Sequence, residues 1–109
     1  MVVATHRPSR VLIDESAIYS NVQHAVADLD SSSELFAVIK ADAYGHGLLR
    51  VARIAQAAGA AGFCVAVLDE ALTLREAGYK QPILVLGVIS PEYAQLAADH
   101  DIAVPVADL

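Results

Sequence analysis

Lys40 is the residue of this sequence with the clearest potential for chemistry. It follows five apolar residues, Leu35–Ile39, which predict a short strand buried on both faces, and it precedes a polar turn, Asp42–Gly47. Active residues of α/β folds lie where parallel strands end. Apolar neighbours would disfavour the charged ammonium form, and a neutral amine can attack a carbonyl carbon to form a Schiff base. Taken alone, a lysine at the end of a strand is more often a solvated side chain.

The residues around Lys40 are more specific than the lysine itself. Residues 37–47 read Ala-Val-Ile-Lys-Ala-Asp-Ala-Tyr-Gly-His-Gly, and this stretch closely resembles the cofactor-lysine motif of alanine racemases. Three further stretches are similar to that family: residues 11–22, residues 67–71 with 74–75, and residues 82–87. The similarity therefore covers all but the first several residues. One small difference is Asp42, where the family often has asparagine; either residue suits a turn.

The resemblance implies an activity, a cofactor and roles for individual residues. It implies a homodimeric pyridoxal-phosphate isomerase that interconverts L-alanine and D-alanine, the latter for cell-wall peptidoglycan. The expected compartment is the cytoplasm, because the sequence shows no signal peptide, no membrane span and no disulfide framework. Lys40 would hold pyridoxal phosphate as a Schiff base and act as one of two proton-transfer groups, and the hydroxyl group of Tyr44 would bind the cofactor phosphate. Without the motif, a tyrosine in a turn more often packs its ring against the loop. Val38 and Leu86 either line the cofactor ring or belong to the ordinary core.

The order of apolar runs and helical patterns predicts an α/β fold with a parallel sheet. The predicted strands are a short one at Arg10–Asp14 and four more: Leu35–Ile39, Gly62–Val67, Ile83–Leu86 and Ile102–Val106. The predicted helices are one capped by Asp14 or Ser16 and three more: Leu48–Ala58, Leu68–Ala77 and Pro91–Asp99. The pattern alone also fits a small doubly wound fold.

The resemblance favours a (β/α)8 TIM-type barrel, of which this chain covers about the first half. A complete barrel needs ~250 residues, and the chain has 109. We therefore expect a flexible leader at residues 1–9, the N-terminal part of a pyridoxal-phosphate-binding barrel domain at residues 10–109, and a C-terminal β domain outside the chain. A sheet of this size would have an open edge.

Composition excludes several other classes of function. The net charge of −6 and the scattered basic residues argue against a nucleic-acid backbone as partner. No apolar stretch approaches the ~20 residues of a membrane span, and Met1–Arg10 lacks the apolar segment of a signal peptide. Cys64 is the single cysteine and is predicted to be a buried strand residue. The histidines have no ligand spacing, so we expect no metal site.

The remaining polar residues near the motif carry weaker predictions. Gly45 and Gly47 permit a backbone shape that a side chain would block, and His46 is expected to fix the turn by hydrogen bonds. Asp69 and Glu70 are either paired carboxylates or ordinary acids at the start of a helix.

Two other functions stay open from the sequence. One is a different barrel-type pyridoxal-phosphate enzyme, either another amino-acid racemase or a decarboxylase, although residues 44–47 argue against a decarboxylase. The other is a non-catalytic pyridoxal-phosphate-binding protein. The resemblance places the opposing catalytic tyrosine and the substrate-binding arginine beyond Leu109, so we do not expect the 109 residues alone to racemise alanine.

Overall fold

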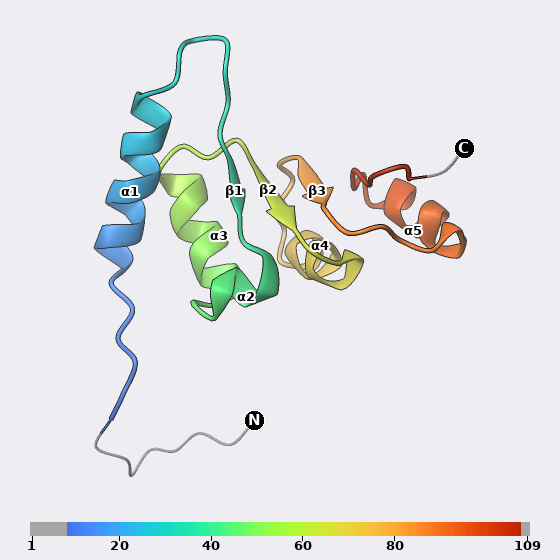
Figure 1. Cartoon of the computed structure of the whole chain (residues 1–109), viewed down its shortest axis with the longest axis horizontal. Helices are drawn as coiled ribbons and strands as arrows, with labels where there is room; N and C mark the ends of the chain where they lie inside the picture. Colours follow the sequence, from blue (N-terminus) through green and yellow to red (C-terminus); the bar gives the residue numbers. More distant parts are fainter. Residues whose placement is uncertain (1–8, 108–109) are drawn as a thin grey trace.

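A computed structural model describes residues 9–107. They form a small parallel sheet whose strands are connected by helices (Figure 1). The elements in chain order are α1 (Glu15–Ala27), β1 (Phe36–Val38), α2 (Lys40–Tyr44), α3 (Leu48–Ala57), β2 (Gly62–Val65), α4 (Leu68–Glu76), β3 (Ile83–Val85), the 3-10 turn η1 (Pro91–Tyr93) and α5 (Ala94–Asp99). The predicted leader lies outside the described residues, except for Ser9, which is exposed.

The sheet has the order β1-β2-β3, and both pairings are parallel, as predicted. Beyond β3 the chain adds a single parallel bridge between Leu84 and Ala103. The Val85 N–H group donates to the Ala103 carbonyl at 2.9 Å, and the Ala103 N–H group donates to the Ile83 carbonyl at 2.9 Å. The fourth predicted strand, Ile102–Val106, is therefore present only as this bridge.

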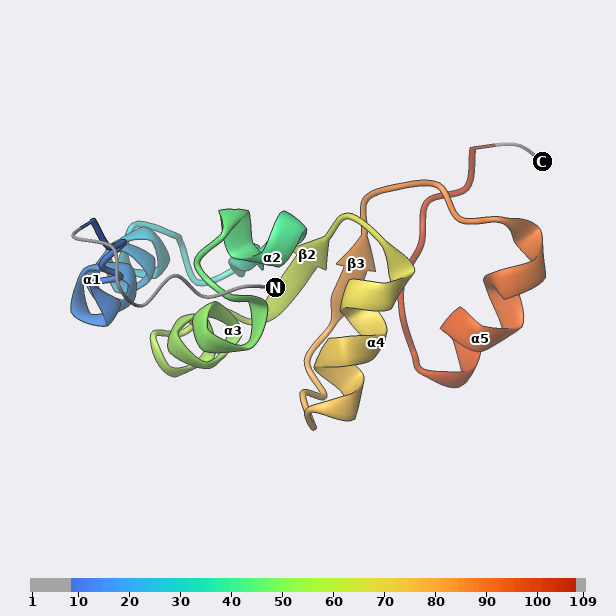
Figure 2. The same ribbon diagram turned by 90° about the horizontal axis from the view of Figure 1, so that it is seen from below.

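The two faces of the sheet differ in what covers them. Helices α3 and α4 lie on the same side of the strands (Figure 2). On that side, Ile39 just after β1 and four strand residues are buried with residues of both helices in one core; the strand residues are Phe63, Val65, Ile83 and Val85. On the opposite face, Phe36, Val38 and Leu86 are exposed, because no described element covers them.

This arrangement excludes a doubly wound sheet within the described residues. Such a sheet reverses its strand order and carries helices on both faces. Here the strands follow one another in sequence order, and the helices that connect them lie on one side. This is the repeat from which a (β/α)8 barrel is built, with the helices outside and the uncovered face inside.

Helix α1 packs on α3 rather than on the sheet, so it extends the molecule sideways (Figure 1). Its N-cap is Asp14, whose Oδ1 accepts the Ala17 N–H group at 3.1 Å. Arg53 of α3 forms an ion pair with Glu15 at 2.7 Å. None of the helices within residues 9–107 has the length and apolar character needed to span a bilayer.

Besides the fourth strand, three further predicted elements differ from the structure. Residues 10–14 form no strand, because none of the described strands pairs with them, and Val11 is 90% exposed. The strand predicted at Gly62–Val67 ends at Val65, since Ala66 and Val67 already turn toward α4. The helix predicted from Pro91 starts as the tighter turn η1 and becomes α-helical only at Ala94.

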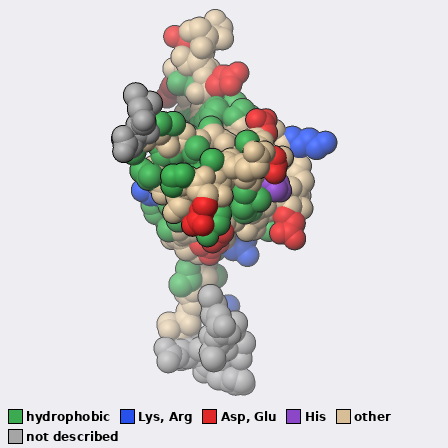
Figure 3. All heavy atoms as spheres, turned by 90° about the vertical axis from the view of Figure 1, so that its right-hand side faces the viewer, with side chains coloured by type: hydrophobic (Ala, Val, Ile, Leu, Met, Phe, Trp, Pro, Cys, Tyr) green, Lys and Arg blue, Asp and Glu red, His purple; other side chains and the backbone are tan. Residues whose placement is uncertain are grey.

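The end of the molecule formed by η1 and α5 shows hydrophobic side chains gathered among acidic ones (Figure 3). Between residues 88 and 107, which include η1 and α5, the exposed large hydrophobic residues are Val88, Tyr93, Leu96 and Val106. The high hydrophobic content of the chain is thus partly displayed on its surface.

Candidate functional site

Lys40 lies where β1 gives way to a turn. The N–H group of Ile39 donates to the Cys64 carbonyl at 2.9 Å, so the hydrogen-bonded ladder continues to the residue before the lysine. Ile39 itself is buried in the core, which fixes the backbone at this point. Lys40 itself is partly exposed.

The turn after Lys40 is a left-handed helical turn. Ala41, Asp42, Ala43 and Tyr44 all have positive φ angles, between 52° and 57°. For residues with a side chain this conformation costs roughly 1–2 kcal/mol each, because Cβ approaches the following carbonyl oxygen. Gly45, at φ 91°, continues the positive-φ run without this penalty. The predicted polar turn therefore begins one residue earlier than expected, at Ala41.

Side chains within the turn hold this conformation. The Oδ1 atom of Asp42 accepts the N–H group of Leu48 at 2.8 Å. It thereby caps α3, whose own N-cap, Gly47, has no side chain. The Nδ1 atom of His46 lies 3.0 Å from the Ala43 carbonyl, which confirms the prediction that His46 fixes the turn.

Glu70 connects this turn to the next loop along the sheet. Its Oε2 atom accepts the N–H group of Asp42 at 3.2 Å. Its Oε1 atom accepts the N–H groups of Ala66 and Val67 at 2.9 and 3.3 Å. One carboxylate thus binds the segments that follow β1 and β2.

The other predicted site residues lie on or beside the uncovered face. Val38 is 44% exposed, and Leu86 is 45% exposed. The Leu86 N–H group donates to the Val65 carbonyl at 2.7 Å, so Leu86 continues β3 at the same end of the sheet as Lys40. Tyr44 is 61% exposed, so its ring does not pack into the described part of the chain. The structure therefore places Val38 and Leu86 at the surface and not in a closed core.

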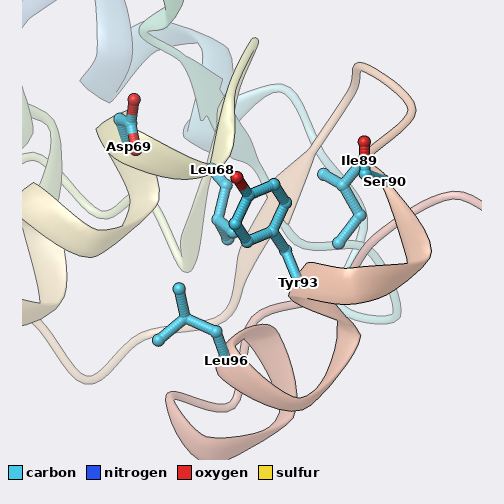
Figure 4. A pocket seen from close by; sticks show the side chains of 6 residues that line it. All are labelled: Leu68, Asp69, Ile89, Ser90, Tyr93 and Leu96. Atoms are coloured by element: carbon cyan, nitrogen blue, oxygen red, sulfur yellow. The ribbon is translucent and has the colours of Figure 1, made fainter.

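A separate pocket of about 300 Å³ lies between the start of α4 and the segment that contains η1 and α5 (Figure 4). It is lined by Leu68, Asp69, Ile89, Ser90, Tyr93 and Leu96. Figure 4 shows apolar side chains and the Tyr93 ring on most of its wall. None of the predicted site residues lines it, so this pocket is not the site around Lys40.

Cys64 is a buried strand residue, as predicted, with 8% of its surface exposed. Burial raises the pKa of its thiol, because the thiolate would lose hydration. Within residues 9–107, no three His, Cys, Asp or Glu side chains are placed to share a metal ion.

These observations define a class of protein, the (β/α)8-barrel proteins. The described strands are parallel, the helices that connect them lie on one side, and a lysine follows the carboxyl end of β1. Comparison with known proteins gives the family within that class. Residues 13–109 match the family model described as alanine racemase, N-terminal domain, and the chain belongs to this family.

Individual relatives agree with the family model. The alanine racemase of Lacticaseibacillus casei (strain BL23) is 60% identical over 107 residues, which are 98% of this chain and 28% of that protein. The alanine racemase of Pediococcus pentosaceus is 54% identical over 108 residues, 99% of this chain and 29% of that protein. The chain therefore spans less than a third of the length of these relatives.

Solved structures show the same fold. The crystal structure of alanine racemase from E. faecalis matches 98% of this chain and 29% of that chain, with a TM-score of 0.92 and 50% identity. A histidine racemase from Leuconostoc mesenteroides matches 91% of this chain and 26% of that chain, with a TM-score of 0.74 and 43% identity. The fold is thus shared by racemases named for two amino acids.

Sequence reasoning missed the contact between Glu70 and the turn after Lys40. The usual signal for a glutamate that caps a helix is a serine or threonine three residues earlier, but Val67 stands there. Valine has no side-chain acceptor, so only the glutamate half of that motif exists. The contact with Asp42 joins residues 28 positions apart and has no local signal at all.

Proposed function

We propose that this chain is the N-terminal part of an alanine racemase in which Lys40 holds pyridoxal phosphate and transfers a proton at the substrate Cα atom. The observation that carries the proposal is the position of Lys40 at the carboxyl end of β1, inside a motif of the matched family. Pyridoxal phosphate, when bound, accepts the electron pair that remains when Cα loses its proton.

The residues present suit this group. Lys40 offers a primary amine, and Tyr44 presents an exposed hydroxyl group four residues further on, which suits a phosphate. Val38 and Leu86 offer exposed apolar side chains at the same end of the sheet, which suit the flat face of a ring. We assign covalent attachment and one proton transfer to Lys40, phosphate binding to Tyr44, and ring contacts to Val38 and Leu86.

Racemisation needs proton transfer on both faces of Cα. Lys40 serves one face, and the resemblance assigns the other to a tyrosine outside these 109 residues. We further propose that the complete enzyme is a cytoplasmic homodimer that takes alanine and supplies D-alanine for peptidoglycan. A histidine racemase with the same fold makes another amino acid the second candidate substrate.

The test is a grafted enzyme, in which this chain replaces the segment that it matches in the L. casei alanine racemase. We expect the grafted enzyme to interconvert L- and D-alanine, and Lys40→Ala to abolish this activity. Lys80→Ala is the matched control, since Lys80 is the only other lysine of the chain, and it should leave activity unchanged. Racemisation of histidine in preference to alanine would favour the second candidate.

Two results would contradict the proposal. One is a folded grafted enzyme that does not racemise any amino acid. The other is a Lys40→Ala variant as active as its parent. Borohydride reduction followed by peptide mapping gives an independent readout, because it locates the cofactor on Lys40 or elsewhere.

A further inference from the structure

We propose that Glu70 is a positioning residue for Lys40. Its carboxylate fixes the backbone of the turn that carries the lysine, by binding N–H groups from two neighbouring βα loops at once. This inference rests on the proposed function of Lys40.

An ordinary helix cap explains only half of the contacts that Glu70 makes. As the third residue of α4, a glutamate can reach back to the N–H groups that precede the helix, and Oε1 does so at Ala66 and Val67. Oε2 instead accepts the N–H group of Asp42, from the loop after β1. The second oxygen is therefore available to hold the neighbouring loop.

The group that Oε2 binds belongs to the strained part of the turn. Asp42 lies two residues after Lys40 and has a φ of 56°. The side chain of Asp42 also connects the turn to α3, because its Oδ1 atom accepts the Leu48 N–H group at the start of that helix. The carboxylate of Glu70 thus anchors the left-handed turn that directly follows Lys40.

Neighbouring acids do not share this arrangement. Asp69 lies beside Glu70 in the first turn of α4, yet its carboxylate makes no hydrogen bond with another described residue; only its backbone carbonyl accepts one, from Thr73. Charge at the start of a helix is common to both residues, so it does not explain the contact with Asp42. Asp69→Asn is therefore a control with the same change in charge, one position away.

Glu70→Gln separates the two halves of the contact. The amide can present its oxygen to Ala66 and Val67 and keep the cap, but its NH2 group then faces the Asp42 N–H group, donor against donor. In the 109-residue chain, we expect the Asp42 amide to exchange with solvent at least tenfold faster in Glu70→Gln, measured by NMR. The Val67 amide should change less than threefold, and Asp69→Asn should change neither.

The functional readout uses the grafted enzyme. Glu70→Gln should lower kcat for alanine about tenfold and leave KM within twofold, because the lysine is displaced while the substrate contacts remain. Glu70→Asp, whose shorter side chain cannot span both loops, should show a similar loss of kcat. Asp69→Asn should match its parent in both parameters.

The outcomes separate the two proposals. An inactive but folded parent enzyme overturns the proposed function, and the role of Glu70 with it. An active parent in which Glu70→Gln equals Asp69→Asn, either in kcat or in Asp42 exchange, overturns the role of Glu70 alone. Faster Asp42 exchange together with a selective loss of kcat supports it.

Discussion

Replacing Arg75 by methionine should destabilise the fold without disturbing the turn at Lys40. Arg75 donates to four backbone carbonyls, those of Tyr79, Gln81, His100 and Asp101, at 2.7–2.8 Å. These carbonyls come from the segments before β3 and after α5, at the end of the sheet opposite Lys40. The guanidinium group therefore ties the return loops together by charge-assisted bonds.

The magnitude follows from which of these carbonyls water can reach. The bonds to His100 and Asp101 are exposed, so water replaces them at little cost. The bonds to Tyr79 and Gln81 are partly buried, and losing the charged donor should cost about 1.5 kcal/mol for each. We therefore expect Arg75→Met to lower the free energy of unfolding by about 3 kcal/mol.

Urea unfolding followed by circular dichroism measures this loss. Arg53→Met is the matched control, because Arg53 makes an exposed ion pair with Glu15, which should contribute less than about 1 kcal/mol. Arg75→Lys should recover part of the loss, since one ammonium group cannot reach all four carbonyls. Equal losses in Arg75→Met and Arg53→Met would refute the reasoning.

Three further predictions concern single positions. Gly62→Ala should destabilise the chain by about 1–3 kcal/mol in the same urea assay, because a Cβ atom would lie 2.6 Å from the Pro82 carbonyl oxygen; a loss below about 0.5 kcal/mol would contradict this. Cys64 should react with iodoacetamide more slowly than glutathione at pH about 8.5, because burial raises its pKa and keeps the thiol protonated; stability should correspondingly fall as pH rises above that value, and equal alkylation rates would be the contrary result. Asp42→Ala should cost about 1 kcal/mol by removing the cap at Leu48, whereas Asp42→Asn, which keeps an acceptor oxygen, should cost less; equal costs would show that this bond does not matter.

The sequence was sufficient to predict the order of the main elements. Alternating apolar runs and helical patterns are local signals, and the three strands and their parallel pairing are confirmed. The burial of Cys64 and the hydrogen bond of His46 to its own turn are also local consequences of strand and turn chemistry. The false strand at residues 10–14 shows the limit of such signals, because an apolar run forms a strand only when another strand pairs with it.

The shape of the turn at Lys40 was not predictable. Alanine carries no preference for positive φ, so Ala41 and Ala43 gave no sign of a left-handed conformation, and only Gly45 and Gly47 indicated unusual backbone. The conformation depends instead on contacts made from other segments, such as the bond from the Asp42 amide to Glu70. Contacts of that kind follow from the three-dimensional fold and have no signal in the local order of residues along the sequence.

The left-handed turn also has a consequence for chirality. A right-handed helix is the default for L-amino acids, so by mirror symmetry four successive residues with φ between 52° and 57° follow the path that D-amino acids prefer. In a chain assembled by chemical ligation, D-alanine at position 41, which is exposed, should therefore fit this backbone better than the natural L-alanine. The four residues that follow Lys40 therefore form a short left-handed helix, the mirror image of the usual one, from L-amino acids.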